Sequence, residues 1–173
     1  MIKVFCHAAE VGVAQQILSI KNLLSPDVFS FSAEVFNAAD KILTSQGTIK
    51  DSDISICGFD SINENKTSAF LKRANNHNIK SIGILDTWKG IDRFFFEDGS
   101  HRDLTDIILV FDEFSKSYLI NKGIPENKLE VSTNFFLDEL LQFLENKKND
   151  FTKKDEFFIN LQLDRDKPNL FFF

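Results

Sequence analysis

A doubly wound α/β fold is the architecture that the sequence predicts, with a mostly parallel sheet and helices on both of its faces. Two observations lead to this prediction. Short runs rich in Ile, Val and Phe alternate along the chain with segments whose apolar residues recur at helical spacing. The short runs are apolar almost throughout, which is typical of parallel strands buried on both faces. An alternation of this kind, wound right-handed, is Rossmann-like.

The expected elements follow from this pattern in chain order. The first strand, IKVFC (2–6), precedes a helix over residues 10–24, on which Val13, Ile17 and Leu24 share one face. Further strands are expected at residues 27–32, 53–59, 79–85, 106–111 and 129–133. Further helices are expected at residues 63–78, 112–123 and 135–148, together with a short helix at 33–43 that runs into a stub of strand.

The chain is expected to hold one domain and the beginning of another segment. Its 173 residues suit one domain of ordinary size, which we place at residues 1–149. Residues 150–173 first turn charged and polar, as a linker does, and then end on KPNLFFF (167–173), which has the composition of a strand. Two interpretations stay open: this strand pairs within the chain's own sheet, or it begins a truncated second domain.

Composition excludes several classes of function. The net charge is −6 at pH 7, and Lys and Arg are scattered among acids, which argues against nucleic-acid binding. Cys6 and Cys57 each lie in an apolar run, which predicts buried, reduced thiols and a cytoplasmic location. We expect no signal peptide and no membrane span, and peripheral contact with a membrane stays open. No glycine-rich phosphate loop occurs, and the histidines lack metal-ligand spacing, so neither a metal nor a tightly bound cofactor is expected.

Polar residues gather just after the expected strands, which is where ligands bind in an open α/β sheet. The most informative stretch is ILDTWKGIDRFF (84–95), where the only Trp of the chain stands among charges at the end of an apolar run. An aromatic platform beside carboxylates suits a small polar ligand such as a sugar. The candidate residues that share this position after a strand are His7, Glu10, Gly58, Asp60, Asp86, Trp88 and Arg93.

Each candidate also has a plainer structural explanation. Acids after a strand often cap the next helix, and for Asp112 capping is the favoured interpretation. The alternatives for the others are a satisfied, half-buried His7, a Trp88 that packs over the sheet edge, and an ordinary surface pair of Asp92 with Arg93.

Three stretches carry a resemblance to a known family: CHAAEVGVAQQILS (6–19), IKSIGILDTWKGIDRFF (79–95) and DIILVFDEFSKSYLINKGIPENKLEVSTN (106–134). In this order they resemble the amino-terminal Rossmann domain of two-domain, nucleotide-sugar-using enzymes of bacterial surface-polysaccharide biosynthesis. Those enzymes have the GT-B-like glycosyltransferase fold of two facing Rossmann units, which is also found in sugar-nucleotide epimerases. The resemblance spans roughly residues 2–145. The chain departs from it at Ala8 and Ala9, where close approach to a ligand favours glycine.

The resemblance implies the acceptor-binding half of a glycosyltransferase-like enzyme, which is inactive without a second Rossmann domain or chain. His7 or Glu10 would act as the general base that removes a proton from an acceptor hydroxyl. The sugar acceptor would be held by residues after the third and fourth strands: Gly58, Asp60, Asp86, Trp88 and Arg93. The nucleotide-sugar donor would be bound mainly by the second domain.

Two other classes of function stay open. One is a non-catalytic binding or assembly module that docks a partner by adding its C-terminal strand to the partner's sheet. The other is a stand-alone, flavodoxin-like binder of a nucleotide or flavin, which the missing phosphate loop disfavours. The sequence does not identify the donor, the acceptor, the oligomeric state or the nature of the chain's end.

Overall fold

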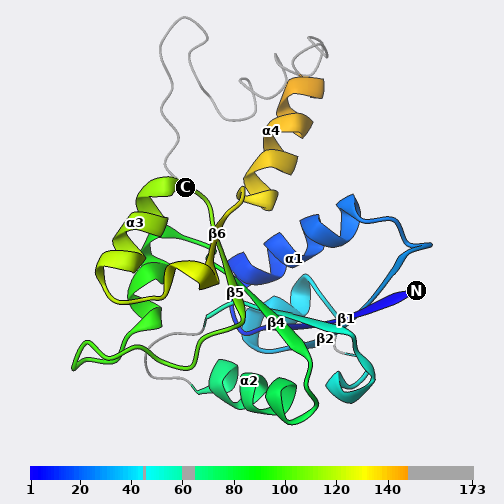
Figure 1. The fold of residues 1–173 in the computed structure, drawn as a ribbon. Coiled ribbons are helices and arrows are strands. Elements are labelled where there is room, and N and C mark those ends of the chain that lie inside the picture. The colour runs from blue at the N-terminus through cyan, green and yellow to red at the C-terminus, as the bar shows by residue number, and fades with distance from the viewer. Residues whose placement is uncertain (45, 60–64, 148–173) are drawn as a thin grey trace, which may run out of the picture. The chain divides into compact units, whose positions relative to one another are not determined.

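The structure is a computed structural model that describes residues 1–44, 46–59 and 65–147 of the chain (Figure 1). The strands are β1 (Ile2–Ala8), β2 (Phe29–Val35), β3 (Ile54–Cys57), β4 (Lys80–Ile84), β5 (Ile107–Val110) and β6 (Leu129–Val131). The α-helices are α1 (Val11–Leu23), α2 (Lys66–Asn76), α3 (Glu113–Asn121) and α4 (Phe135–Lys147). The 3₁₀ helices are η1 (Asn37–Lys41), η2 (Ile49–Asp51), η3 (Trp88–Phe94) and η4 (Glu126–Lys128).

Within the described residues, six parallel strands form one sheet in the order β2-β1-β3-β4-β5-β6. This confirms the predicted Rossmann-like α/β class. From β1 the chain moves to one side to form β2, and it then crosses to the other side of β1 to form β3. The strand order therefore reverses between β1 and β3. In open α/β sheets such a reversal opens a crevice at the carboxyl ends of the strands, which is the usual ligand site.

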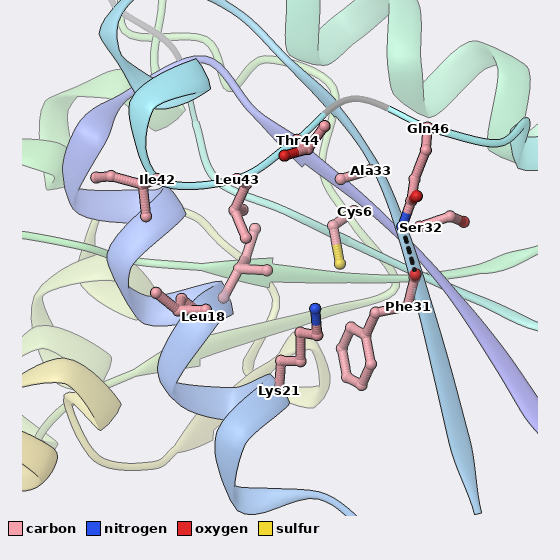
Figure 2. A pocket seen from close by; sticks show the side chains of 11 residues that line it. Cys6, Leu18, Lys21, Phe31, Ser32, Ala33, Ile42, Leu43, Thr44 and Gln46 are labelled. Atoms are coloured by element: carbon pink, nitrogen blue, oxygen red, sulfur yellow. Dashed lines mark hydrogen bonds between the residues drawn. The ribbon is translucent and has the colours of Figure 1, made fainter. Parts of the chain in front are cut away.

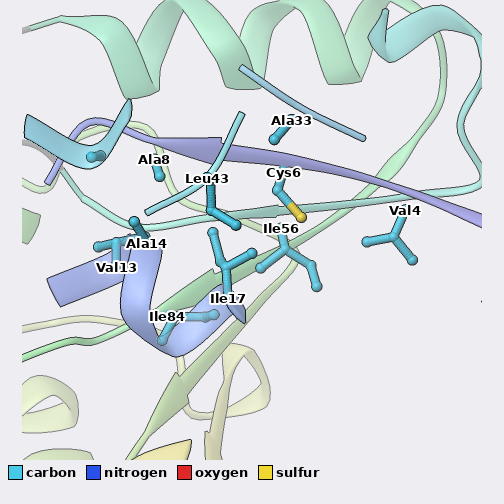
Figure 3. Packing of buried hydrophobic residues seen from close by; sticks show 11 residues of the cluster. Val4, Cys6, Ala8, Val13, Ala14, Ile17, Ala33, Leu43, Ile56 and Ile84 are labelled. Carbon is cyan, nitrogen blue, oxygen red and sulfur yellow. The ribbon is translucent and has the colours of Figure 1, made fainter. Parts of the chain in front are cut away.

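Helices cover both faces of the sheet, because side chains of a strand alternate between the two faces (Figure 1). On β1, Val4, Cys6 and Ala8 face α1 and pack against its apolar stripe (Figure 3). The intervening Phe5 packs on the opposite face in a cluster with Phe70 of α2. Burial from both sides explains why β1 is apolar almost throughout.

A separate core lies under η3 and α3, on the β5–β6 side of the sheet. Phe94 of η3 and Leu119 of α3 are fully buried there with Ile108 of β5. The ring of Phe59, just after β3, lies 4.2 Å from that of Phe94 between centroids. This aromatic contact holds η3 close to the end of β3, which matters for the site described below.

One expected element is wrong. Residues 33–43 were expected to form a short helix, but Ala33 and Val35 belong to β2, and only Asn37–Lys41 form a 3₁₀ helix. Each residue of β1 from Ile2 to Ala8 pairs with a residue of β2. The hydrogen bonds of this ladder outweigh the modest helix propensity of Ala and Glu at positions 33 and 34. The other strands and α-helices lie where they were expected, with ends that differ by a few residues.

The chain divides into two compact units, Met1–Phe136 with the sheet and Leu137–Phe173 with most of α4. The expected domain boundary at residue 149 and the strand-like stretch 167–173 lie outside the described residues. No described helix combines the length and the apolar character that crossing a bilayer requires.

Candidate functional site

The carboxyl ends of β1, β3 and β4 lie side by side at the reversal of the strand order. His7 of β1 is in register with Cys57 of β3, which is in turn in register with Gly83 of β4. Because paired residues of a parallel sheet point to the same face, these three positions form one row across the sheet. The segments that follow this row carry most of the predicted site residues.

A buried ion pair closes the end of β4. The guanidinium Nη1 of Arg93 lies 3.6 Å from Oδ1 of Asp86, and it donates a hydrogen bond of 2.9 Å to the carbonyl oxygen of Phe59. The Asp86 side chain is only 8 % exposed, and that of Arg93 is 22 % exposed. Arg93 therefore ties the loop after β3 to the loop after β4, at the edge where ligands bind in this kind of sheet.

Local sequence explains how η3 presents Arg93. Thr87 adopts an extended backbone and caps η3, since its Oγ1 accepts a 3.1 Å hydrogen bond from the backbone N–H of Gly90. Phe94, the next residue after Arg93, is buried against Phe59. Cap and aromatic anchor together hold Arg93 toward Asp86.

Two glycines let the backbone approach the Asp86 carboxylate. A Cβ on Gly12, in the first turn of α1, would lie 2.7 Å from Oδ2 of Asp86. A Cβ on Gly90 would lie 3.1 Å from Oδ1 of the same carboxylate. Burial raises the pKa of Asp86, and the nearby charge of Arg93 only partly opposes this effect. Asp86 is therefore a carboxyl group that holds its proton more tightly than an exposed Asp does.

Gly58 is required by packing at the same edge. A Cβ at this position would lie 2.0 Å from Cγ2 of Val13, so that no side chain fits between the end of β3 and α1. Gly58 thus brings α1 against the end of β3. Its predicted role in acceptor binding stays a prediction.

A second polar group lies on the α2 face of the sheet, and it centres on His7. The ring of His7 is 1 % exposed and stacks on Phe70, with 4.9 Å between the ring centroids. Its Nδ1 lies 2.8 Å from Oε1 of Glu34, which also bonds to the guanidinium of Arg73. In the described part of the chain, Nε2 of His7 is a buried atom without a hydrogen-bond partner.

Glu34 is held ionised by its neighbours. Burial alone would raise its pKa, but the hydrogen bond and charge of His7, together with Arg73, outweigh burial and lower the pKa of Glu34. The Oε1 atom of the ionised Glu34 accepts hydrogen bonds from Nδ1–H of His7 and from the guanidinium of Arg73. The group is thus a chain of three side chains from β1, β2 and α2.

Sequence reasoning missed Glu34 and Arg73. Glu34 lies opposite His7 because Ile2 pairs with Phe29, whereas the strand expected at residues 27–32 ended before position 34. No sequence signal exists for Arg73, since helix packing, rather than strand register, brings it to Glu34. Gln16 was also missed: it lies buried on α1, and its Nε2 donates a 3.3 Å hydrogen bond to the carbonyl oxygen of Leu85.

The predicted site residues fall into two groups at one edge of the sheet. Asp86 contacts α1 through Gly12, whereas His7 contacts α2 through Phe70, and these helices cover opposite faces (Figure 1). Glu10 adopts the extended N-cap position of α1, is partly exposed and makes no side-chain cap hydrogen bond.

Two predicted site residues lie wholly or partly outside the described structure, and one predicted helix cap is confirmed. Asp60 lies outside the described residues, and the structure describes the backbone of Trp88 as the first residue of η3 but not its side chain. Capping by Asp112 is confirmed, since its Oδ1 accepts a 2.7 Å hydrogen bond from the backbone N–H of Ser115 in α3. Among the described residues, no three His, Cys, Asp or Glu side chains gather as metal ligands do.

Comparisons with known proteins define the fold more closely. No protein-family model and no curated protein matches the sequence. The UDP-GlcNAc 2-epimerase of Neisseria meningitidis, solved with UDP-GlcNAc bound, matches with a TM-score of 0.55 and 16 % identity over 91 % of this chain and 54 % of that chain. The UDP-N-acetylglucosamine 2-epimerase of Rickettsia bellii matches with a TM-score of 0.55 and 12 % identity over 95 % of this chain and 52 % of that chain.

The chain spans about half the length of these two enzymes. At these low identities the likeness concerns the fold, and it agrees with the expected resemblance to Rossmann units of nucleotide-sugar enzymes. This chain therefore shares its Rossmann-like α/β fold with about half of each of these two enzymes.

Proposed function

We propose that this chain is one Rossmann half of a nucleotide-sugar enzyme, and that its sugar acceptor binds at the carboxyl ends of β1, β3 and β4. The observation that carries the proposal is the buried pair of Asp86 with Arg93 at this edge, in a fold whose neighbours are enzymes of UDP-GlcNAc. Buried ionisable groups beside a strand-order reversal are typical of binding and catalytic sites.

Each side chain of the proposed site has a role in binding. Arg93 offers guanidinium N–H groups to a sugar hydroxyl or to a phosphate oxygen, for which its planar fork is well suited. Asp86 holds Arg93 in place and accepts hydrogen bonds from hydroxyl groups. Trp88 provides the aromatic face on which a sugar ring stacks. Gly58 and Asp60 complete the acceptor side in the loop after β3.

Glu10 is the preferred general base. Its carboxylate is partly exposed in the loop after β1, two residues before Gly12, which contacts Asp86. His7 is the alternative base, but its Nε2 is buried, so an acceptor hydroxyl reaches it only after a rearrangement.

The reaction we favour is sugar transfer, completed by a second Rossmann domain that binds the nucleotide-sugar donor. Glu10 takes the proton of the acceptor hydroxyl, and the hydroxyl oxygen attacks the anomeric carbon of the donor sugar. The bond from that carbon to the phosphate oxygen breaks, and the nucleoside diphosphate leaves with its electron pair. A role in cell-surface polysaccharide biosynthesis belongs to the same proposal, and the resemblance of the sequence supports it.

Binding of sugars to the chain tests the proposal. Backbone amide NMR with N-acetylglucosamine, glucose, UDP and UDP-GlcNAc is expected to shift residues 8–12, 58–59 and 85–93. Replacing Arg93 by Met is expected to weaken binding by about tenfold or more, because a charged hydrogen-bond donor is lost. Lys80→Met is the matched control, since it also removes one cation but at the other end of β4.

Asp86→Asn gives a second test that retains the shape of the site. It is expected to weaken the same binding while the amide spectrum stays folded. If none of the four ligands shifts residues at this edge at millimolar concentration, the proposed site is wrong. Shifts that persist in full in both the Arg93 and Asp86 variants would equally contradict it.

A further inference from the structure

A pocket lies away from this site, beside edge strand β2 and on the α1 face of the sheet (Figure 2). Its volume is about 340 Å³, which lies at the lower end of the range for small-molecule sites. Leu18 of α1, Phe31 of β2 and the Ile42–Leu43 segment form apolar walls. Cys6 of β1 is buried at its base.

A charged side chain, that of Lys21, lines this pocket. Lys21, in the last turn of α1, is the only ionised side chain among the described residues that line it. No acidic side chain is within ion-pair distance of Lys21 in the described part of the chain. The Lys21 side chain is directed along the pocket toward Cys6 (Figure 2). An ammonium group thus stands over a pocket that has apolar walls and the polar side chains of Ser32, Thr44 and Gln46, with no acidic side chain among its described lining residues.

The base of the pocket is electrically neutral. Burial raises the pKa of the Cys6 thiol to about 12, an effect that the ammonium of Lys21 only partly opposes. Cys6 is therefore a protonated, apolar-like surface, and thiolate chemistry does not explain the presence of Lys21.

We infer that this pocket binds a small organic monoanion, a carboxylate with a short acyl or aryl body, whose charged group pairs with Lys21. The apolar body lies between Leu18, Phe31 and the Ile42–Leu43 segment, where it is removed from water. A single ammonium matches one carboxylate, whereas phosphate dianions require several converging donors. This inference is independent of the proposed function, since it uses none of the residues assigned there.

Placement of Lys21 at the helix end has a competing explanation. Cations near a helix C-terminus interact favourably with its dipole, and this needs no ligand. The two explanations differ in one measurable respect: the dipole explanation predicts no ligand-dependent effect of Lys21, whereas the binding explanation does.

Titration of the full chain with octanoate, followed by backbone amide NMR, tests the inference. Residues 17–21, 31–33 and 42–46 are expected to shift, while residues 85–93 of the proposed sugar site stay unchanged. Uncharged octanamide, of the same shape, is expected to bind about tenfold more weakly, because it lacks the charge-assisted hydrogen bond to Lys21. The octanoate affinity is expected to fall as ionic strength rises.

Two variants and one control complete the experiment. Lys21→Met is expected to reduce octanoate affinity to that of octanamide, whereas Lys50→Met, which removes an exposed cation of η2, is expected to change nothing. Leu18→Trp fills the pocket and is expected to abolish binding of both compounds. Equal affinities of octanoate and octanamide, unchanged octanoate affinity in Lys21→Met, or shifts confined to other residues would each overturn the inference.

Discussion

Asp86 and Glu34, two carboxylates at the carboxyl ends of the strands, each pair with an arginine from a later part of the chain. Their pKa values nevertheless shift in opposite directions. Burial dominates at Asp86, whose partner Arg93 stays 3.6 Å away, and its pKa is raised. At Glu34 burial is outweighed by direct hydrogen bonds from His7 and Arg73, and its pKa is lowered.

This difference in pKa suggests a structural role for Glu34 and a binding role for Asp86. Glu34 binds His7 and Arg73 through one carboxylate oxygen, Oε1, and so joins β1, β2 and α2. Asp86 has an ionic partner 3.6 Å away and backbone hydrogen bonds from residues 86 and 87, but burial outweighs them, so its charge is incompletely compensated. Incomplete compensation is costly for stability, and it is a feature of functional sites.

The largest expected effect is on the packing that supports the Asp86 side. Gly58→Ala is expected to lower the free energy of unfolding by about 3 kcal/mol, because its methyl group would overlap Val13. Urea unfolding measures this change. The double variant Val13→Ala with Gly58→Ala is expected to lose less than the two single changes together, since the clash is relieved. A loss below about 1 kcal/mol for Gly58→Ala would contradict the close contact.

The direct comparison of the two carboxylates is expected to give the next largest effect. Glu34→Gln is expected to lower the free energy of unfolding by about 1–2 kcal/mol, because the ionised hydrogen bonds to His7 and Arg73 weaken. Breaking a fully buried ion pair would lower the free energy of unfolding by more, but the Arg73 side chain is 48 % exposed. Asp86→Asn is expected to stay within about 0.5 kcal/mol of the wild type, since burial already opposes the charged form of Asp86 and Asn retains its shape. If chemical denaturation shows a larger loss of stability for Asp86→Asn than for Glu34→Gln, the proposed difference between the two carboxylates is wrong.

The pH dependence of stability sharpens the same contrast. The folded-state pKa of Glu34 lies below its ordinary value of 4.5, so its stabilisation is complete above that value and is lost as pH falls through the lowered pKa. The folded-state pKa of Asp86 lies above its ordinary value of 3.8, so its contribution is complete below that value and is lost as pH rises through the raised pKa.

Denaturation at several values from about pH 3 to pH 7 reads out both effects. The stability difference between wild type and Glu34→Gln is expected to shrink in acid. The stability of Asp86→Asn relative to wild type is expected to rise as pH rises from acid to neutral. Parallel pH profiles for the two variants would mean that the two sites do not differ as described.

The smallest expected effect comes from an ion pair outside both groups. Nζ of Lys80 lies 3.4 Å from Oδ1 of Asp106 at the amino end of β4, and the Lys80 side chain is 80 % exposed. Lys80→Met is expected to change the free energy of unfolding by less than about 0.5 kcal/mol, because water and salt screen an exposed pair. The same urea titration provides the measurement, and a change above about 1 kcal/mol would show that exposed charges matter more here than at most surfaces.

Much of the fold followed from local patterns in the sequence. Apolar runs predicted the strands and helical spacing predicted the α-helices, because burial imposes a period of two or of about 3.6 residues on adjacent positions. Capping by Asp112 was predicted for the same reason, since a cap depends on residues three positions apart. The region 33–35 was predicted wrongly, because pairing with β1 decided its structure.

The amino-acid order by itself thus determined the kinds of elements, their succession and the edge at which polar residues collect. Tertiary structure alone decided that His7 faces α2 beside Glu34 and Arg73, while Asp86 faces α1 beside Arg93 and Gly12. The physical reason is that the pKa of a carboxylate depends on burial and on charges a few ångströms away. Those neighbours come from strands and helices far apart in the chain, so only the packing of the sheet brings them together.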